Sequence, residues 1–365
     1  MKFNFQAKAQ VVFEKNGVMN HKDEFSKLGE SAFIVTGKNS GLCSGALTDV
    51  KIVLEDLGIR YLVFDSIENN PSFENVKIAA NLARDFSPDF IVGIGGGSPL
   101  DASKAIALLV TNDIEPIELY DGNFKCNPLP IIAIPTTAGS GSEVTPYAIL
   151  TREDMTTKKS FRSDDAIPQI AFLDATYTKS MSTEIAINTA IDAFSHALEG
   201  YLNVNSTIIS DIFALEVFRV FGECLPSICK FDFNDVCREK LLYASFLGGI
   251  VITHTGTTSI HSLGYSLTYF KGVQHGKANG LLLAEYLRKI YSTASSKIDN
   301  VFSLINVKDI SSFKEMLKTL LPYENDITDK EFERYASITI NQKKNSDLAY
   351  LNKHDLVDIF VNSMR

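Results

Sequence analysis

The 365-residue chain shows two different patterns of hydrophobic positions, one in each half. In the first half, short runs of β-branched and other apolar residues alternate with stretches of helical periodicity. Strands that alternate with helices form mostly parallel sheets with helices on their faces, so we expect an α/β domain whose cofactor binds at the strand C-termini. The apolar runs predict five strands, at residues 31–37, 61–65, 90–97, 131–137 and 170–174.

Beyond Ser180 the pattern changes, because apolar residues now recur every three or four positions. This spacing predicts amphipathic helices at 183–202, 208–225 and 235–251, and therefore an all-α second half. The change falls near residues 175–182, so we expect a first domain at 1–179 and a second at 180–365. A cofactor on the sheet would then meet a helical site in the cleft between the halves.

Composition and charge narrow the class of protein. The net charge of −9 and the pI near 5.3 argue against nucleic acid or an anionic membrane surface as the main partner. The five cysteines are an odd number without a C-x-x-C pair, which favours reduced thiols over a disulfide framework. The N-terminus has no signal-peptide pattern and no apolar run approaches membrane-spanning length, so we expect a cytoplasmic protein.

Four candidate metal ligands occur in the second half. Asp192 and His196 are four residues apart, which places them on one face of a helix, and His261 and His275 could complete the set. One oxygen and three nitrogens suit iron or zinc better than calcium or magnesium. The alternative is a solvated Asp-x-x-x-His pair, although a charge among apolar neighbours needs a partner or a metal. His254, one heptad before His261, is expected to share its helix face as a packing or supporting residue.

A glycine-rich turn follows the predicted strand at residues 90–97. Gly95, Gly96 and Gly97 leave the backbone open, and Ser98 is the expected N-cap of a helix with Pro99 at its first position. The free N–H groups of that helix could bind a pyrophosphate. The alternative is an ordinary tight turn, since Ser98 stands where the dinucleotide fingerprint G-x-G-x-x-G has its last glycine.

A second polar loop follows the predicted strand at residues 131–137. Its hydroxyl side chains stand among Gly139 and Gly141 and could bind a ribose, a phosphate or a nicotinamide amide. A solvated surface loop is the alternative, but two such loops after two strands of one sheet favour a nucleotide site. The hydroxyl residues are Thr136, Thr137, Ser140, Ser142 and Thr145.

Four motifs in this order resemble the iron-containing (group III) alcohol dehydrogenase family: GGGSPLDASKA, PTTAGSGSEVT, DAFSHALEGY and the segment from His261 to His275. The resemblance covers about residues 5–290. It implies a dinucleotide-binding α/β domain, then an all-helical domain that holds Fe²⁺, with Zn²⁺ as the alternative. The related glycerol dehydrogenases and dehydroquinate synthases use three protein ligands and usually zinc. The implied ligands here are the four residues Asp192, His196, His261 and His275.

The same resemblance implies residues that bind the cofactor. The family's pyrophosphate loop corresponds to Gly95, Gly96, Gly97 and Ser98, with Asp101 and Lys104 on the following helix. Its nicotinamide and ribose loop corresponds to Thr136, Thr137 and Ser142, and a lysine on the cofactor side corresponds to Lys158.

The residues after the first predicted strand bear on the choice of cofactor. Members that use NAD commonly carry an acidic residue here, which binds the adenosine ribose, whereas this chain has Gly37. The small residue leaves room for a 2′-phosphate, and Lys38, Asn39 and Ser40 could bind it. We therefore expect NADP(H) over NAD(H), the alternative being a turn without selectivity.

One position departs from the family pattern. Many members have a second histidine four residues after the third ligand, often assigned to proton relay, and this chain has Tyr265. A tyrosine hydroxyl can relay a proton, but its ordinary pKa near 10 makes it a poor base at neutral pH. Three alternatives follow: Tyr265 takes over the proton relay, water takes it over, or turnover is slower than in members that have the histidine.

The sequence thus predicts a metal-dependent, NADP(H)-preferring oxidoreductase that interconverts a small alcohol or diol and its aldehyde by hydride transfer. An NADPH preference would favour aldehyde reduction in cells, and a homodimer is expected from the family and from symmetry preferences. The alternatives are a metal-dependent lyase of the dehydroquinate-synthase type, which would need a cluster of basic residues, and a non-enzymatic nucleotide-binding regulator.

Overall fold

The computed structural model describes residues 2–155, 157–324, 326–342 and 346–365. The chain divides into two compact units. The sheet unit comprises Gln6–Ser182, and the helical unit comprises Thr183–Arg365 together with the chain up to Phe5. The expected boundary, between residues 179 and 180, lies three residues before this division. No pattern in the sequence pointed to the N-terminal segment joining the helical unit.

The sheet unit is built on six parallel strands in the order β1-β8-β5-β4-β2-β3. All five expected strands are confirmed, and the expected α/β fold with them. The short edge strand β1 and the antiparallel hairpin of β6 and β7 were not expected from the sequence. The strands are β1 (Gln10–Phe13), β2 (Ser31–Gly37), β3 (Arg60–Ile67), β4 (Phe90–Gly95), β5 (Ile131–Pro135), β6 (Tyr147–Arg152), β7 (Thr157–Arg162) and β8 (Ile170–Leu173).

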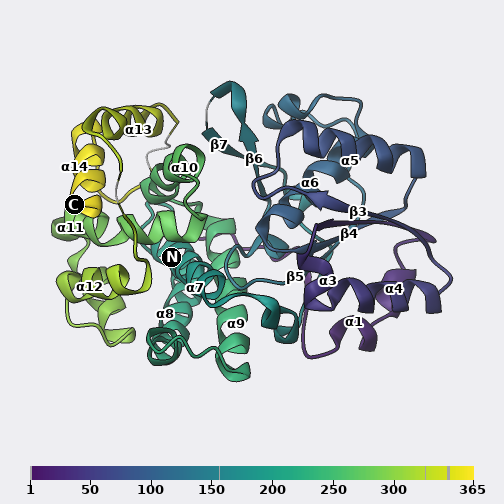
Figure 1. Ribbon diagram of the computed structural model, residues 1–365, viewed down its shortest axis with the longest axis horizontal. Coiled ribbons are helices and arrows are strands. Elements are labelled where there is room, and N and C mark those ends of the chain that lie inside the picture. Colours follow the sequence, from purple (N-terminus) through teal and green to yellow (C-terminus); the bar gives the residue numbers. More distant parts are fainter. Residues whose placement is uncertain (1, 156, 325, 343–345) are drawn as a thin grey trace. The chain divides into compact units, whose positions relative to one another are not determined.

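Alternate residues of the strands face two separate hydrophobic cores. Phe33 and Val35 of β2 point into one core, which helices α5 and α6 cover, whereas Ala32 and Ile34 point into the other, which α1 and α4 cover. Figure 1 shows these helices on opposite faces of the strands. The helices of this unit are α1 (Gly17–Asn20), α2 (Asp23–Ser26), α3 (Ser40–Ser44), α4 (Ala46–Asp56), α5 (Phe73–Phe86) and α6 (Gly97–Thr111).

The strand order reverses between β2 and β4. From β2 the chain adds β3 on one side, and it then returns to place β4, β5 and β8 in succession on the other side. Connections that leave in opposite directions open a crevice at the strand C-termini, which is where ligands of such sheets bind. The segments that begin at Gly37 and Gly95 follow these two strands, so the topology brings both to this crevice.

The helical unit is organised around α7, in which every residue from Ala186 to Tyr201 except Thr189 is buried. Helices α8, α9 and α11 pack against it, as Figure 1 shows for α8 and α9. The three expected helices are confirmed as α7, α8 and α9. The helices are α7 (Thr183–Tyr201), α8 (Ile208–Cys229), α9 (Asp235–Thr255), α10 (Ser259–Lys271), α11 (His275–Leu304), α12 (Ile310–Leu320), α13 (Asp329–Gln342) and α14 (Lys353–Met364).

Close packing between α7 and α11 depends on a glycine. A Cβ atom at Gly276, in the first turn of α11, would overlap the carbonyl oxygen of Asn188 in α7. Only glycine permits this backbone approach without a shift of one helix. The contact brings His275, the residue before Gly276, to the segment of α7 that carries Asp192.

The expectation that His254 shares a helix face with His261 is wrong. Helix α9 ends at Thr255, and Gly256, with φ of +72°, turns the chain before α10 begins at Ser259. The His254 ring instead stacks on Phe5 with ring centroids 4.7 Å apart. The stacking of His254 on Phe5 therefore packs the N-terminal segment against the helical unit.

In the part of the chain that the structure describes, no helix combines the length and the apolar character that crossing a membrane requires.

Candidate functional site

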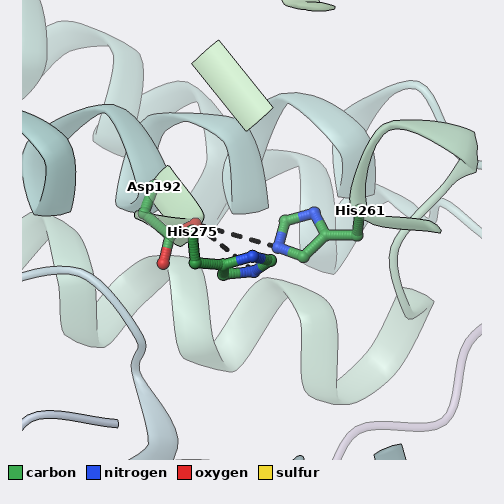
Figure 2. A group of neighbouring side chains, drawn as sticks. All are labelled: Asp192, His261 and His275. Carbon is green, nitrogen blue, oxygen red and sulfur yellow. Dashed lines mark ion pairs between the residues drawn. The ribbon is translucent and has the colours of Figure 1, made fainter. Parts of the chain in front are cut away.

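Three of the candidate metal ligands converge in the helical unit. Asp192 comes from the middle of α7, His261 from the first turn of α10 and His275 from the start of α11 (Figure 2). The Nε2 atoms of both histidines lie 3.9 Å from Oδ1 of Asp192, and the three ligand atoms all lie within 4.8 Å of one another. Asp192 and His261 are only 7% and 3% exposed. Three potential ligand atoms thus meet where two of the three residues are buried and His275 is partly exposed.

Glu199 fixes the orientation of the His261 ring. One carboxylate oxygen of this buried residue accepts a hydrogen bond from Nδ1 of His261, and the other accepts from the backbone N (2.7 Å) and Oγ1 (2.8 Å) of Thr258. Burial opposes ionisation of Glu199, but the neighbouring His261 and these hydrogen bonds outweigh burial and lower the pKa of the carboxyl. With its proton on Nδ1, His261 presents the Nε2 lone pair to Asp192 and His275.

The sequence analysis missed Glu199, although a signal for it was present. Glu199 follows Asp192 by seven residues in an apolar helix, so two turns place both carboxylates on one face. A second carboxylate in such surroundings needs a partner, as the first does.

His196 lies beside the cluster and outside the group of ligand atoms that converge. Its ring stacks on that of His261 with centroids 4.7 Å apart, and the residue is 5% exposed. Among the described residues, the group within 4.8 Å comprises Asp192, His261 and His275. The structure therefore gathers three of the four expected ligands, and His196 as the fourth stays a prediction.

Tyr265 is also close to the cluster. It follows His261 by one helical turn, and its ring stacks on that of His275 with centroids 5.3 Å apart and planes 19° apart. Its ring lies edge-on to His261 at 6.4 Å. The half-buried phenol is thus placed to support His275 or to carry a proton near it.

Asn279 is a second residue that the sequence analysis missed. It follows His275 by one turn of α11 and is fully buried. Its Nδ2 lies 3.1 Å from Oδ1 of Asp192 and 3.2 and 3.3 Å from Nε2 of His261 and His275. The spacing of four from a candidate ligand was the available signal.

The donor set fits a divalent transition metal. One carboxylate oxygen and two imidazole nitrogens suit iron or zinc, whereas calcium and magnesium take oxygen ligands. The hydrogen bond from His261 to Glu199 is the carboxylate–histidine pattern that supports metal-binding imidazoles.

In the sheet unit, the glycine-rich turn leads from β4 into α6. Gly95 has φ of +147°, and a Cβ atom there would lie 2.6 Å from Cγ of Pro99. The expectation of Ser98 as N-cap is wrong, because the helix begins at Gly97 with Gly96 as its N-cap. Because the chain turns at Gly95, the helix begins before Ser98. The Oγ atom of Ser98 instead accepts a hydrogen bond from the backbone N of Asn70 (3.1 Å).

The two expected nucleotide loops pack against each other. The backbone N of Thr136 donates to the carbonyl oxygen of Gly95 (2.9 Å). Cβ atoms at Gly96 and Gly97 would lie 3.1 Å from Oγ1 of Thr137 and 3.2 Å from Cβ of Ser140. Backbone without side chains, at the start of a 15-residue helix and at the crevice of the sheet, fits a phosphate group.

Several other residues expected to bind the cofactor form hydrogen bonds with one another or with neighbours in the sheet unit. Ser142 Oγ donates to Asp101 (2.6 Å) and accepts from Nζ of Lys104 (2.8 Å), which ties the second loop to α6. Burial lowers the pKa of Lys104 to about 8, against the opposing effect of nearby carboxylates. Lys158 Nζ donates to Oδ1 of Asn70 (2.8 Å). Their roles toward a cofactor stay predictions.

The segment expected to choose the cofactor ends β2. Gly37 is its last residue, Lys38 and Asn39 are exposed, and Ser40 begins α3. A Cβ atom at Gly37 would lie 3.2 Å from Ser40 Oγ, the movable end of a side chain. Residues 37–40 contain no carboxylate.

A parallel sheet with a glycine loop at its crevice, together with a helical unit that buries an Asp–His–His cluster, is typical of metal-dependent dehydrogenases. The chain belongs to the iron-containing alcohol dehydrogenase family. Residues 8–175 match the family Iron-containing alcohol dehydrogenase, and residues 186–364 match Fe-containing alcohol dehydrogenase family, C-terminal.

Individual alcohol dehydrogenases and a related reductase are similar to this chain in sequence or structure. The chain is 31% identical to the long-chain primary alcohol dehydrogenase AdhA of Thermoanaerobacter ethanolicus, over 83% of this chain and 78% of that protein. It is 28% identical to lactaldehyde reductase of Escherichia coli K12, over 81% and 78%. A crystal structure of an iron-containing alcohol dehydrogenase from Thermotoga maritima is similar with a TM-score of 0.93 and 36% identity, over 100% of this chain and 99% of that one. The protein is therefore an oxidoreductase of alcohols and aldehydes.

Glu143 carries a buried carboxyl group in the second loop of the sheet unit. It lies in the short 3-10 helix Ser142–Val144 and is 1% exposed, and within the described chain its Oε1 accepts no hydrogen bond. Burial raises the pKa of Glu143 from 4.5 to about 7. The folded chain therefore holds this proton over a pH range in which the unfolded chain releases it.

We expect Glu143→Gln to stabilise the protein at pH 8 but not at pH 4. As pH rises from 4.5 to about 7, the unfolded state loses its proton before the folded state does, so the wild-type free energy of unfolding falls. The advantage of the variant should grow over this interval to about 3 kcal/mol and then level off. Urea unfolding across the pH range measures it, with exposed Glu153→Gln as the control. A difference that does not change with pH would contradict the prediction.

Proposed function

We propose that the protein is a metal-dependent oxidoreductase that prefers NADP(H) and interconverts a small alcohol or diol and its aldehyde. The observation that carries the metal requirement is the convergence of Asp192, His261 and His275 from three helices. One carboxylate oxygen and two imidazole nitrogens that face one point can each supply a lone pair to the same cation.

The metal would be Fe²⁺, with Zn²⁺ as the alternative, and Asp192, His261 and His275 would hold it, joined by His196. When bound, the metal supplies a Lewis acid that polarises the substrate oxygen. Glu199 keeps the proton of His261 on Nδ1, so that Nε2 stays available as a ligand. The low exposure of Asp192 and His261 excludes water, which strengthens electrostatic interactions in the cluster.

The cofactor would bind to the sheet unit. The partly exposed backbone at Gly96 and Gly97 and the N-terminus of α6 would receive the pyrophosphate, and Thr136 and Thr137 would bind the nicotinamide ribose or amide. Asp101, Lys104 and Ser142 would act mainly by holding the second loop in place, since their polar atoms bond to one another.

In the reduction, the bound nicotinamide would supply a hydride to the carbonyl carbon of the aldehyde, and the protein or water would supply a proton to its oxygen. Tyr265, stacked on His275, is the side chain that we assign to this proton, directly or through water. The products are the alcohol and the oxidised cofactor, and the reverse reaction oxidises the alcohol. A cellular excess of NADPH would favour reduction.

The function is tested by mixing the metal-free protein with NADPH and butanal, alone and after addition of Fe²⁺ or Zn²⁺. We expect loss of the reduced-nicotinamide absorbance only when a metal is present. Activity that survives strong chelation would contradict metal dependence. Cofactor binding without turnover of any aldehyde, diol or alcohol would favour a regulatory protein.

We expect His261→Ala to lower turnover by more than about a hundredfold, beyond the cost of losing a residue that only supports a ligand. Binding of NADPH, followed by its fluorescence, should be unchanged because the sheet unit is intact. His354→Ala, at a histidine whose side chain is 82% exposed, is the matched control. Unchanged turnover in His261→Ala would contradict the metal assignment.

The preference for NADP(H) rests on the segment after β2. A 2′-phosphate would meet no carboxylate from residues 37–40, and the exposed Lys38 offers a cation to it. For NAD(H), this segment offers no acidic side chain to hold the ribose hydroxyl groups.

We expect Gly37→Asp to reduce kcat/KM for NADPH by about tenfold or more and to raise it for NADH, because a carboxylate repels the 2′-phosphate and binds the ribose. Steady-state kinetics with both cofactors measure the ratio. Asn127→Asp adds the same charge in the exposed segment before β5, at the opposite ends of the strands, and should change neither value. An unaltered ratio in Gly37→Asp would contradict the preference.

We also propose that the protein is a homodimer, since two-fold dimers are the commonest assemblies of soluble oligomers. Sedimentation velocity should give a species of twice the 40.3 kDa chain mass. A species of the chain mass alone at micromolar concentration would contradict this.

A further inference from the structure

Asn279 has an unusual relation to the three candidate ligands. Its Nδ2 is nearly equidistant from them, at 3.1 Å from Asp192 Oδ1, 3.2 Å from His261 Nε2 and 3.3 Å from His275 Nε2. An amide NH₂ has two hydrogens, so it cannot satisfy three acceptors at once. The contacts are thus set by the position of the side chain and not by ordinary pairwise hydrogen bonding.

The geometry places this end of the carboxamide where a metal ligand would stand. Oδ1 of Asp192 lies 3.9 Å from the Nε2 atoms of His261 and His275, which defines a small triangle of ligand atoms. An atom 3.1–3.3 Å from all three corners lies roughly 2 Å above the plane of the triangle, the length of a metal–oxygen bond for zinc. A cation in the triangle would therefore touch the near end of this side chain.

The other end of the carboxamide is buried. Asn279 is 0% exposed, and within the described chain its Oδ1 accepts no hydrogen bond. A Cβ atom at Gly264 of α10 would overlap this oxygen, so the glycine provides its space. The oxygen, which is the better partner for a cation, thus points away from the cluster while the NH₂ faces it.

We propose that Asn279 is a further residue of the metal site, and that its carboxamide turns on metal binding so that Oδ1 faces the cation. The inference rests on the proposed metal-dependent function. Once a cation takes the lone pairs of Asp192, His261 and His275, an NH₂ beside them loses its acceptors and meets a like charge. Turning the carboxamide exchanges nitrogen and oxygen in the same space, and it replaces this repulsion with attraction between the amide oxygen and the cation.

A different role for Asn279 would have the opposite consequence. If the NH₂ only replaced the cation in the metal-free protein, removing it would destabilise the metal-free state and strengthen metal binding. If Oδ1 faces the cation, removing the amide weakens binding. The sign of the change in metal affinity therefore separates the two roles.

The experiment measures affinity for Zn²⁺ and Co²⁺ by competition with a chromogenic chelator, using the full chain and the variants Asn279→Leu and Asn279→Asp. We expect the nearly isosteric Leu to weaken binding by about 10- to 100-fold. Asp, which has oxygen at both positions, should bind at least as tightly as the wild type. The visible spectrum of the Co²⁺ forms should change in Asn279→Leu, because the surroundings of the ion differ.

Asn203→Ala is the control, since this buried asparagine bonds to the carbonyl oxygens of Gly256 and Thr257 and touches none of the three ligand atoms. Equal or tighter binding by Asn279→Leu would overturn the inference, and so would equally weak binding by Asn279→Asp. Asn279→Ala replaces Leu if thermal unfolding shows that Leu prevents folding. A wild-type chain that takes up neither metal would overturn the proposed function as well, which distinguishes the two failures.

Discussion

The hydrogen bond between the buried carboxylate of Glu199 and Nδ1 of His261 is the interaction on which the helical site depends. It fixes the tautomer and the orientation of the ring, and thereby decides which nitrogen faces Asp192 and His275. Thr258, just before α10, holds the other carboxylate oxygen, so the start of that helix is tied to α7. A change at Glu199 would therefore disturb the contact between two helices as well as a histidine.

Glycines set the distances at which these elements meet. Gly276 lets α11 reach the backbone of α7, and Gly264 leaves space for the Asn279 carboxamide beside α10. In the sheet unit, Gly96 and Gly97 let the glycine-rich turn lie close to Thr137 and Ser140 of the second loop. At Gly276 and Gly264 a Cβ atom would overlap oxygen atoms of Asn188 and Asn279, respectively, so only glycine allows these groups to be so close.

The two units solve the problem of buried polar groups differently. The sheet unit buries Lys104 of α6 near Glu143 of the second loop, and burial lowers the pKa of Lys104 and raises that of Glu143. The attraction between Lys104 and the carboxyl groups offsets only part of the cost of burial. The hydrogen bonds of Lys104 to Ser142 and Thr145 hold the second loop on α6. The helical unit gathers one carboxylate oxygen and two imidazole nitrogens, an arrangement whose donor set suits a transition-metal cation.

Five of the six strands of the parallel sheet, the helices α7, α8 and α9, the glycine loop and the family could be predicted from the sequence, because these depend on local periodicity and on motifs contiguous in the chain. The sequence also indicated Asp192, His261 and His275. The three-dimensional structure was needed to show that Gly96 caps α6, that His254 lies on a different helix from His261, and that Glu199 and Asn279 contact the candidate ligands. The first two outcomes depend on the backbone turns at Gly95 and Gly256. The contacts of Glu199 and Asn279 join α7, α10 and α11, and the spacing of residues within one helix indicates a shared face but not what that face contacts.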